Sequence, residues 1–80
     1  MNETDARSAV LQALREVAPD VEAEDLDPGA RLRQDLELDS LDFLRLLELL
    51  AASTGVAAQE EDYASLTTVQ SLVDYVAARA

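Results

Sequence analysis

The sequence predicts an all-α fold: a four-helix bundle of three principal helices and one short helix, with a long first loop. Hydrophobic residues make up 49% of the chain, yet it contains one Phe, two Tyr and no Trp. Leu, Val and Ala must therefore form the core, which suits packed helices better than a β-sandwich. Apolar residues also recur at helical spacing, and capping residues flank those segments. Because 80 residues suffice for one core, we expect residues 1–80 to form a single domain.

The first helix is expected over residues 6–17, where apolar side chains form a stripe. Pro19 ends it, and one of three polar residues caps its start: Asn2, Thr4 or Asp5. From Asp20 to Glu37 the chain is polar and contains the turn sequence DPG at residues 27–29. We expect this long connection to be held to the core by isolated apolar residues: Val21, Leu26, Leu32 and Leu36.

The second helix is expected over residues 40–54, with Asp39 as its N-cap and Gly55 as the left-handed residue after its end. Asp42 in its first turn complements the helix dipole. The sequence EEDYA at residues 60–64 predicts a short third helix. Thr67 and Gln70 have the spacing of a capping box that opens a last helix, which runs to about residue 79.

The second helix has more leucines than one small core can bury. At 100° per residue, four residues share the face that we expect in the core: Phe43, Leu46, Leu47 and Leu50. Leu41 and Leu44 lie on the opposite face and are expected near the surface. With an acidic rim of Asp39, Asp42 and Glu48 they form a candidate interaction patch. The alternative is that both leucines cover a neighbouring loop.

Charge and composition exclude several classes of function. Seventeen acids and six bases give a net charge of −11, which repels nucleic acids and anionic membranes and attracts basic protein patches. The absence of cysteine excludes disulfides and thiolate metal sites. We see no signal peptide and no membrane span, so we expect a cytoplasmic location.

Ser40 lies at the expected start of the second helix, where its hydroxyl would be exposed. The chain has no histidine and no lysine, so Ser40 lacks the usual base that would make it a hydrolytic nucleophile. A phosphate attached at a helix start would meet free backbone N–H groups and the positive end of the dipole. Position alone therefore leaves two interpretations, a residue that starts the helix and a site of covalent modification.

The sequence LRQDLELDSLD, residues 32–42, resembles the modification loop of acyl carrier proteins, in which an Asp-Ser-Leu triplet carries phosphopantetheine. Asp35 and Leu36 precede the triplet at the family's spacing, and TTVQSLVDYV, residues 67–76, is similar to the family's last helix. The resemblance implies a covalent 4′-phosphopantetheine on Ser40, transferred from coenzyme A by a Mg²⁺-dependent phosphopantetheinyl transferase. The thiol of this arm would hold acyl groups as thioesters, which explains the missing cysteine.

The resemblance also implies a non-enzymatic carrier that delivers acyl groups to loading, transferring or condensing enzymes of fatty-acid, polyketide or other specialised pathways. Asp39 and Asp42 would dock basic patches on partners, and Leu41 and Leu44 would contact partners or line an acyl pocket. The expected docking surface also includes three outer acids: Glu48, Glu60 and Glu61. We expect a free-standing monomer.

Three positions depart from the family's pattern. Glu37 stands where carriers commonly have glycine, Arg45 replaces a frequent acid, and Glu48 replaces an apolar residue that contacts acyl chains. A carboxylate at position 48 disfavours deep burial of a long chain. We therefore hypothesise a specialised carrier of a short or polar acyl unit.

The sequence leaves two alternatives open and disfavours a third. A peptidyl or D-alanyl carrier would hold an aminoacyl thioester on the same arm. A non-carrier acidic helical adaptor would bind a basic partner through Leu41 and Leu44, with Ser40 unmodified or phosphorylated. A calcium loop starting at Asp25 would need an oxygen ligand at its fifth position, glycine at its sixth and glutamate at its twelfth. Gly29, Ala30 and Leu36 stand at these positions, so we expect no metal site.

Overall fold

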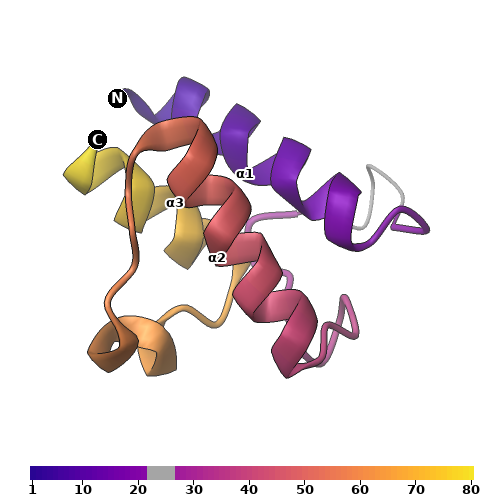
Figure 1. Ribbon diagram of the computed structural model, residues 1–80. Helices are drawn as coiled ribbons and strands as arrows, with labels where there is room; N and C mark the ends of the chain where they lie inside the picture. The colour runs from indigo at the N-terminus through magenta and orange to yellow at the C-terminus, as the bar shows by residue number, and fades with distance from the viewer. Residues whose placement is uncertain (22–26) are drawn as a thin grey trace.

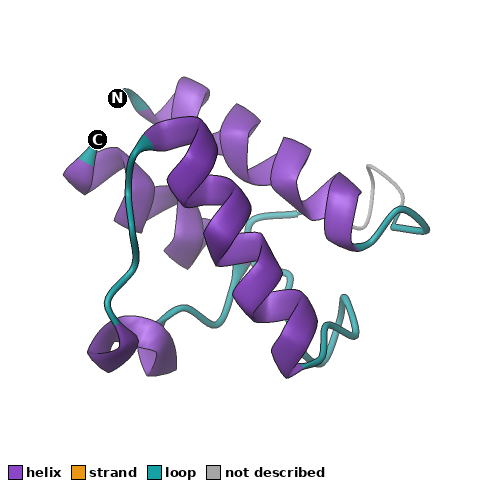
Figure 2. Cartoon of the chain, in the orientation of Figure 1, coloured by secondary structure: helices purple, strands orange, loops and turns teal. Residues whose placement is uncertain are grey.

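The computed structural model describes residues 1–21 and 27–80. In these ranges the chain forms helices α1 (Glu3–Val17), α2 (Ser40–Thr54) and α3 (Val69–Arg79) and a short 3₁₀ helix, η2 (Glu60–Ser65), with no strand (Figure 1). Figure 2 shows the long loop before α2. This architecture confirms the predicted all-α fold. Leu26, expected as a core anchor, and Asp25, where the rejected calcium loop would begin, lie outside the described residues.

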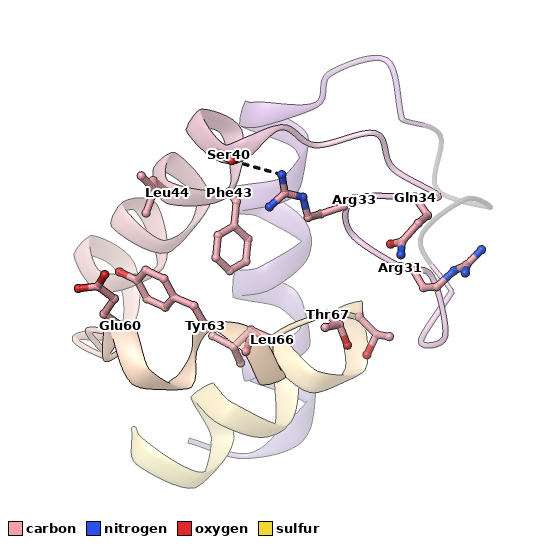
Figure 3. A pocket seen from close by; sticks show the side chains of 12 residues that line it. Arg31, Arg33, Gln34, Ser40, Phe43, Leu44, Glu60, Tyr63, Leu66 and Thr67 are labelled. Carbon is pink, nitrogen blue, oxygen red and sulfur yellow. Dashed lines mark hydrogen bonds between the residues drawn. The ribbon is translucent and has the colours of Figure 1, made fainter.

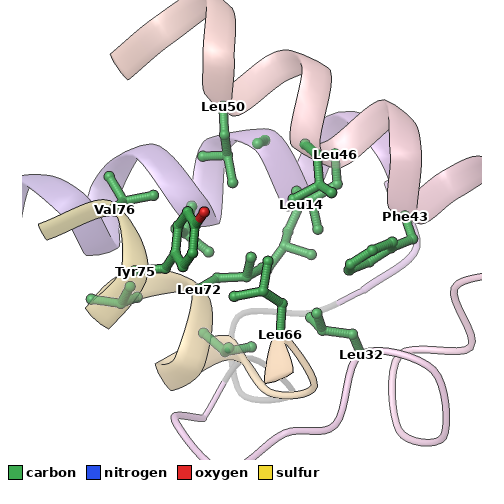
Figure 4. Packing of buried hydrophobic residues seen from close by; sticks show 14 of the residues in the cluster. Leu14, Leu32, Phe43, Leu46, Leu50, Leu66, Leu72, Tyr75 and Val76 are labelled. Atoms are coloured by element: carbon green, nitrogen blue, oxygen red, sulfur yellow. The ribbon is translucent and has the colours of Figure 1, made fainter. Parts of the chain in front are cut away.

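A single cluster of buried apolar side chains holds the helices together, and α1 packs against both α2 and α3. Figure 4 shows Leu14 of α1, Leu46 of α2 and Leu72 of α3 meeting at its centre. The cluster consists mainly of Leu, Val and Ala, as predicted from the composition. Burial of one leucine side chain stabilises the fold by about 2 kcal/mol.

Helix α2 has the predicted bounds and the predicted caps. The Asp39 carboxylate accepts a hydrogen bond from the Asp42 backbone N–H (2.8 Å), while the Asp42 carboxylate accepts one from the Asp39 N–H (3.4 Å). Gly55 ends the helix at φ 78°, a left-handed conformation that favours glycine. The four predicted core residues of α2 are buried.

The start of α3 differs from the prediction by one residue. Thr68, not Thr67, is the N-cap, and its capping box is with Ser71, not Gln70. The Thr67 carbonyl accepts a hydrogen bond from the Leu32 N–H instead (2.9 Å). This contact holds Thr67 in the preceding loop, so the helix begins one residue later.

The loop before α2 is fixed to the start of α3. Besides the contact of Leu32 with Thr67, the Val69 and Gln70 N–H groups donate to the carbonyls of Ala30 and Pro28, both at 3.0 Å. Loop carbonyls thus satisfy N–H groups that the first turn of α3 would otherwise leave unpaired.

Leucines of the same loop enter the core. Leu32 and Leu36 are buried, as predicted, and Leu38, which we did not predict, is buried as well. Val21 is half-buried. The chain therefore reaches Ser40 from a segment that is itself part of the core.

Helix η2 has no buried residue and is held to α3 by Tyr75. The Tyr75 hydroxyl donates to the Asp62 carboxylate (2.7 Å) and accepts from the Gln59 N–H (3.3 Å). The Arg79 guanidinium lies over the Tyr75 ring, 3.6 Å from its centroid. These contacts place η2 opposite the start of α2.

An ion pair closes the turn that precedes α2. The Asp35 carboxylate accepts hydrogen bonds from the Arg31 backbone N–H (2.8 Å) and from its guanidinium (3.2 Å). The guanidinium and backbone hydrogen bonds hold the pKa of Asp35 below its ordinary value of 3.8. The same pair raises the pKa of Arg31.

Glu37 occupies the left-handed region at φ 58°. A side chain there brings Cβ close to the carbonyl oxygen, at a cost of roughly 1–2 kcal/mol. This explains why glycine is the expected residue at this position. The neighbouring leucines, both buried, keep the backbone in this conformation despite the cost.

We predict that Glu37→Gly raises the free energy of unfolding by about 1 kcal/mol. Relief of the backbone strain stabilises the folded state, and the extra conformational freedom of glycine in the unfolded chain offsets part of this gain. Urea unfolding of both proteins measures the difference. Glu37→Gln is the matched control, since it removes the charge but keeps Cβ. If the glutamine variant gains as much stability as the glycine variant, relief of charge repulsion rather than strain is the cause.

We predict a pH-dependent contribution from Asp35. The pKa of Asp35 is lower in the folded protein than in the unfolded chain, where it is near 3.8. Its contribution to the stability of the fold is therefore fully present above that pH and is lost as the pH falls through the lower pKa of the folded protein. Melting temperatures measured from neutral pH into this range should therefore fall less steeply for Asp35→Asn than for the wild type. Asp20→Asn, which removes one charge from an exposed position, should retain the wild-type slope. Identical slopes for all three proteins would contradict the role of the ion pair.

Candidate functional site

Ser40 is the first residue of α2 and is exposed. Its Oγ accepts a hydrogen bond from the Arg33 guanidinium, with Nη2 at 3.2 Å (Figure 3). The chain contains no histidine or lysine that could activate this hydroxyl. The arrangement thus presents an accessible hydroxyl that another enzyme can modify.

A cavity of about 800 Å³ lies beside Ser40, bordered by α2, η2 and the loops that precede α2 and α3. Phe43 and Tyr63 both line it and meet edge to face, with ring centroids 5.7 Å apart at an angle of 84° (Figure 3). Apolar and polar residues both line it: Arg31, Arg33, Gln34, Ser40, Phe43, Leu44, Glu60, Tyr63, Ala64, Leu66, Thr67 and Thr68.

The residues expected around Ser40 hold different positions. Asp39 and Asp42 flank it, and both carboxylates also take part in the capping box. Leu41 is 77% exposed and therefore covers no neighbouring loop. Leu44 is 42% exposed and lines the cavity.

The outer acids are not equivalent. Glu60 lines the cavity from η2. Glu61 is exposed on the same helix, and Glu48 is exposed on α2, and neither is among the residues that line the cavity. The cavity thus brings together Ser40, Leu44 and Glu60 but not Glu48.

Sequence patterns missed several residues that line the cavity, and two of these make contacts that shape the site: Arg33 and Tyr63. Arg33 lies seven positions before Ser40 in a segment without periodicity, so nothing local indicated that the two side chains meet. Tyr63 faces Phe43 only because η2 is held beside α2. The sole available signal was the scarcity of aromatic residues in the chain, which makes each one a candidate for a defined contact.

The residues present fit a phosphopantetheine group on Ser40. The serine Oγ is accessible, and a guanidinium suited to a phosphate oxygen already contacts it. The adjoining cavity offers apolar surface from Phe43 and Leu44 and hydrogen-bonding groups from Gln34 and Thr67. Both kinds of surface suit an amide-containing arm with an acyl end.

Comparison with known proteins agrees with this geometry. Residues 8–76 match the family described as "Phosphopantetheine attachment site". The chain is 37% identical over 73 residues to an acyl carrier protein of Rubrobacter xylanophilus, a match that covers 88% of this chain and 90% of the relative. It is 32% identical, with the same coverage, to an acyl carrier protein of Thermosynechococcus vestitus.

The family match spans most of the described fold and includes the exposed serine and the residues that line its cavity. The chain therefore belongs to the acyl carrier protein family, and its cofactor is a covalently attached 4′-phosphopantetheine.

Proposed function

We propose that Ser40 is the attachment residue and that the chain carries acyl intermediates as thioesters on the arm. It delivers them to enzymes of a fatty-acid, polyketide or other specialised pathway and catalyses no step itself. The observation that supports this most directly is the accessible Ser40 hydroxyl, which contacts a guanidinium at the edge of a cavity.

Loading of the arm requires a partner enzyme. A bond forms between Ser40 Oγ and phosphorus while the pyrophosphate bond of coenzyme A breaks and its nucleotide half leaves. The hydroxyl proton must pass to a base, and the chain offers neither histidine nor lysine. We therefore assign the base and the Mg²⁺ to the transferase.

The proposed docking surface surrounds Ser40. Leu41 gives it an exposed apolar centre, and Asp39 and Asp42 supply negative charge next to the attachment point. Glu60 and Glu61 of η2 and Glu48 of α2 extend the acidic rim. With a net charge of −11, this surface favours partners with basic patches and disfavours nucleic acid. We further propose that residues 1–80 form a monomeric carrier domain and that the protein is located in the cytoplasm.

We further propose a short or polar acyl cargo, on grounds other than the carboxylate of Glu48. Glu48 is exposed and is not among the residues that line the cavity. Support comes instead from the polar lining groups of Gln34 and Thr67. A long saturated chain lying over these exposed groups would displace their water without replacing its hydrogen bonds.

The first test is modification with coenzyme A, Mg²⁺ and a broad-specificity phosphopantetheinyl transferase. Intact-protein mass spectrometry should show the gain of one phosphopantetheinyl group in the wild type and none in Ser40→Ala. The exposed Ser8→Ala is the matched control and should be modified like the wild type. Loading of Ser40→Ala, or no loading of the wild type even by the native organism's transferase, would overturn the assignment.

The cargo is tested by comparing melting temperatures of the acetyl-, malonyl- and palmitoyl-loaded forms. A tethered cargo that binds in the cavity stabilises the folded state, because the unfolded chain offers it no such site. We expect malonyl to raise the melting temperature above that of the acetyl form and palmitoyl to give no further rise. If palmitoyl stabilises the protein most, the cavity accepts long chains and the cargo proposal is wrong. Aminoacyl forms in the same assay test the peptidyl or D-alanyl alternative.

A further inference from the structure

Arg33 differs from the other described arginines in contacting a serine hydroxyl. Arg7, Arg31 and Arg79 approach the carboxylates of Glu3, Asp35 and Asp62, whereas Arg15 and Arg45 form neither an ion pair nor a side-chain hydrogen bond with the described residues. No carboxylate within residues 1–21 and 27–80 forms an ion pair with Arg33. Its guanidinium instead donates to the neutral Ser40 hydroxyl.

The position of this cation suits the modified form of the serine better than the unmodified form. A phosphodiester at Ser40 places one negative charge and two unesterified oxygens next to the atom that Arg33 already contacts. The planar guanidinium can donate two parallel hydrogen bonds to such a group. It also offsets the repulsion between the phosphodiester and the carboxylates of Asp39 and Asp42, which lie one and two residues from Ser40.

We propose that Arg33 binds the phosphodiester formed at Ser40 and thereby directs the arm towards the cavity. Arg33 itself lines that cavity, together with Phe43 and Leu44, and Figure 3 shows its guanidinium reaching the start of α2 from the loop. The inference rests on the proposed attachment at Ser40. Arg33 is a positioning residue, since it takes no part in bond formation.

A purely structural role for Arg33 predicts a different outcome. If its contact with Ser40 served only to hold the loop against α2, modification would break that contact and release the side chain to solvent. Apo and modified proteins therefore distinguish the two roles.

The test compares the apo and modified wild type by NMR, and both with Arg33→Gln. Mass spectrometry first establishes that the group is present. On modification, the Arg33 Nε–H signal should shift and exchange more slowly with water. The ³¹P line of the phosphodiester should be narrower in Arg33→Gln than in the wild type, because the group then moves more freely. Arg33→Lys keeps the charge but loses the planar guanidinium, so its ³¹P line width should lie between those of the wild type and Arg33→Gln.

Arg45→Gln is the matched control, because Arg45 is exposed on α2 and is not among the residues that line the cavity. Its ³¹P line width should equal that of the wild type. If the modified wild type shows neither a shift nor slower exchange at Arg33, the inference is wrong, although attachment at Ser40 stands. If no group is found on Ser40, the proposed function fails and the inference fails with it. If Arg33→Gln cannot be modified, the Arg33 Nε–H signal of the modified wild type decides alone: a shift with slower exchange supports the inference, and the absence of both overturns it.

Discussion

The docking of residues 28–38 onto the core and the start of α3 determines where Ser40, the proposed attachment residue, lies. Ordering a loop residue costs about 1–2 kcal/mol in backbone entropy, so a polar loop of this length does not hold one conformation unaided. Burial of Leu32, Leu36 and Leu38 offsets part of that cost, at about 2 kcal/mol each. Hydrogen bonds between residues 28–32 and 67–70 fix the direction of the chain. The strained conformation of Glu37 is tolerated because the residues on both sides of it are buried.

The same loop organises charge at the site. In a chain with a net charge of −11, the two loop arginines have separate roles. Arg31 is engaged by Asp35 and stabilises the turn, while Arg33 reaches Ser40. Carboxylates of Asp39 and Asp42 thus flank Ser40, while the Arg33 guanidinium contacts its hydroxyl.

Most features set by local sequence were predicted, whereas features set by contacts between distant segments were not. An exception is the start of α1, which was expected at residue 6 but lies at Glu3, directly after its cap Asn2. The bounds and caps of α2 depend on Asp39 and Gly55 at its own ends, and the exposure of Leu41 and Leu44 follows from helical angles. The N-cap of α3 was misplaced because the Thr67 carbonyl bonds to Leu32, far away in the sequence.

Side-chain contacts between elements were equally invisible in the sequence. Arg33 meets Ser40, and Tyr63 meets Phe43, only after the loop and η2 have docked. Hydrogen exchange tests that docking most directly, by comparing the loop-associated amides of Leu32, Leu38 and Val69 with the core amide of Leu50 in α2. We expect comparable protection of these amides, because the docked residues separate from the core only when the core unfolds. Rapid exchange of the three amides while Leu50 stays protected would contradict it, since the loop would then not fix the position of Ser40.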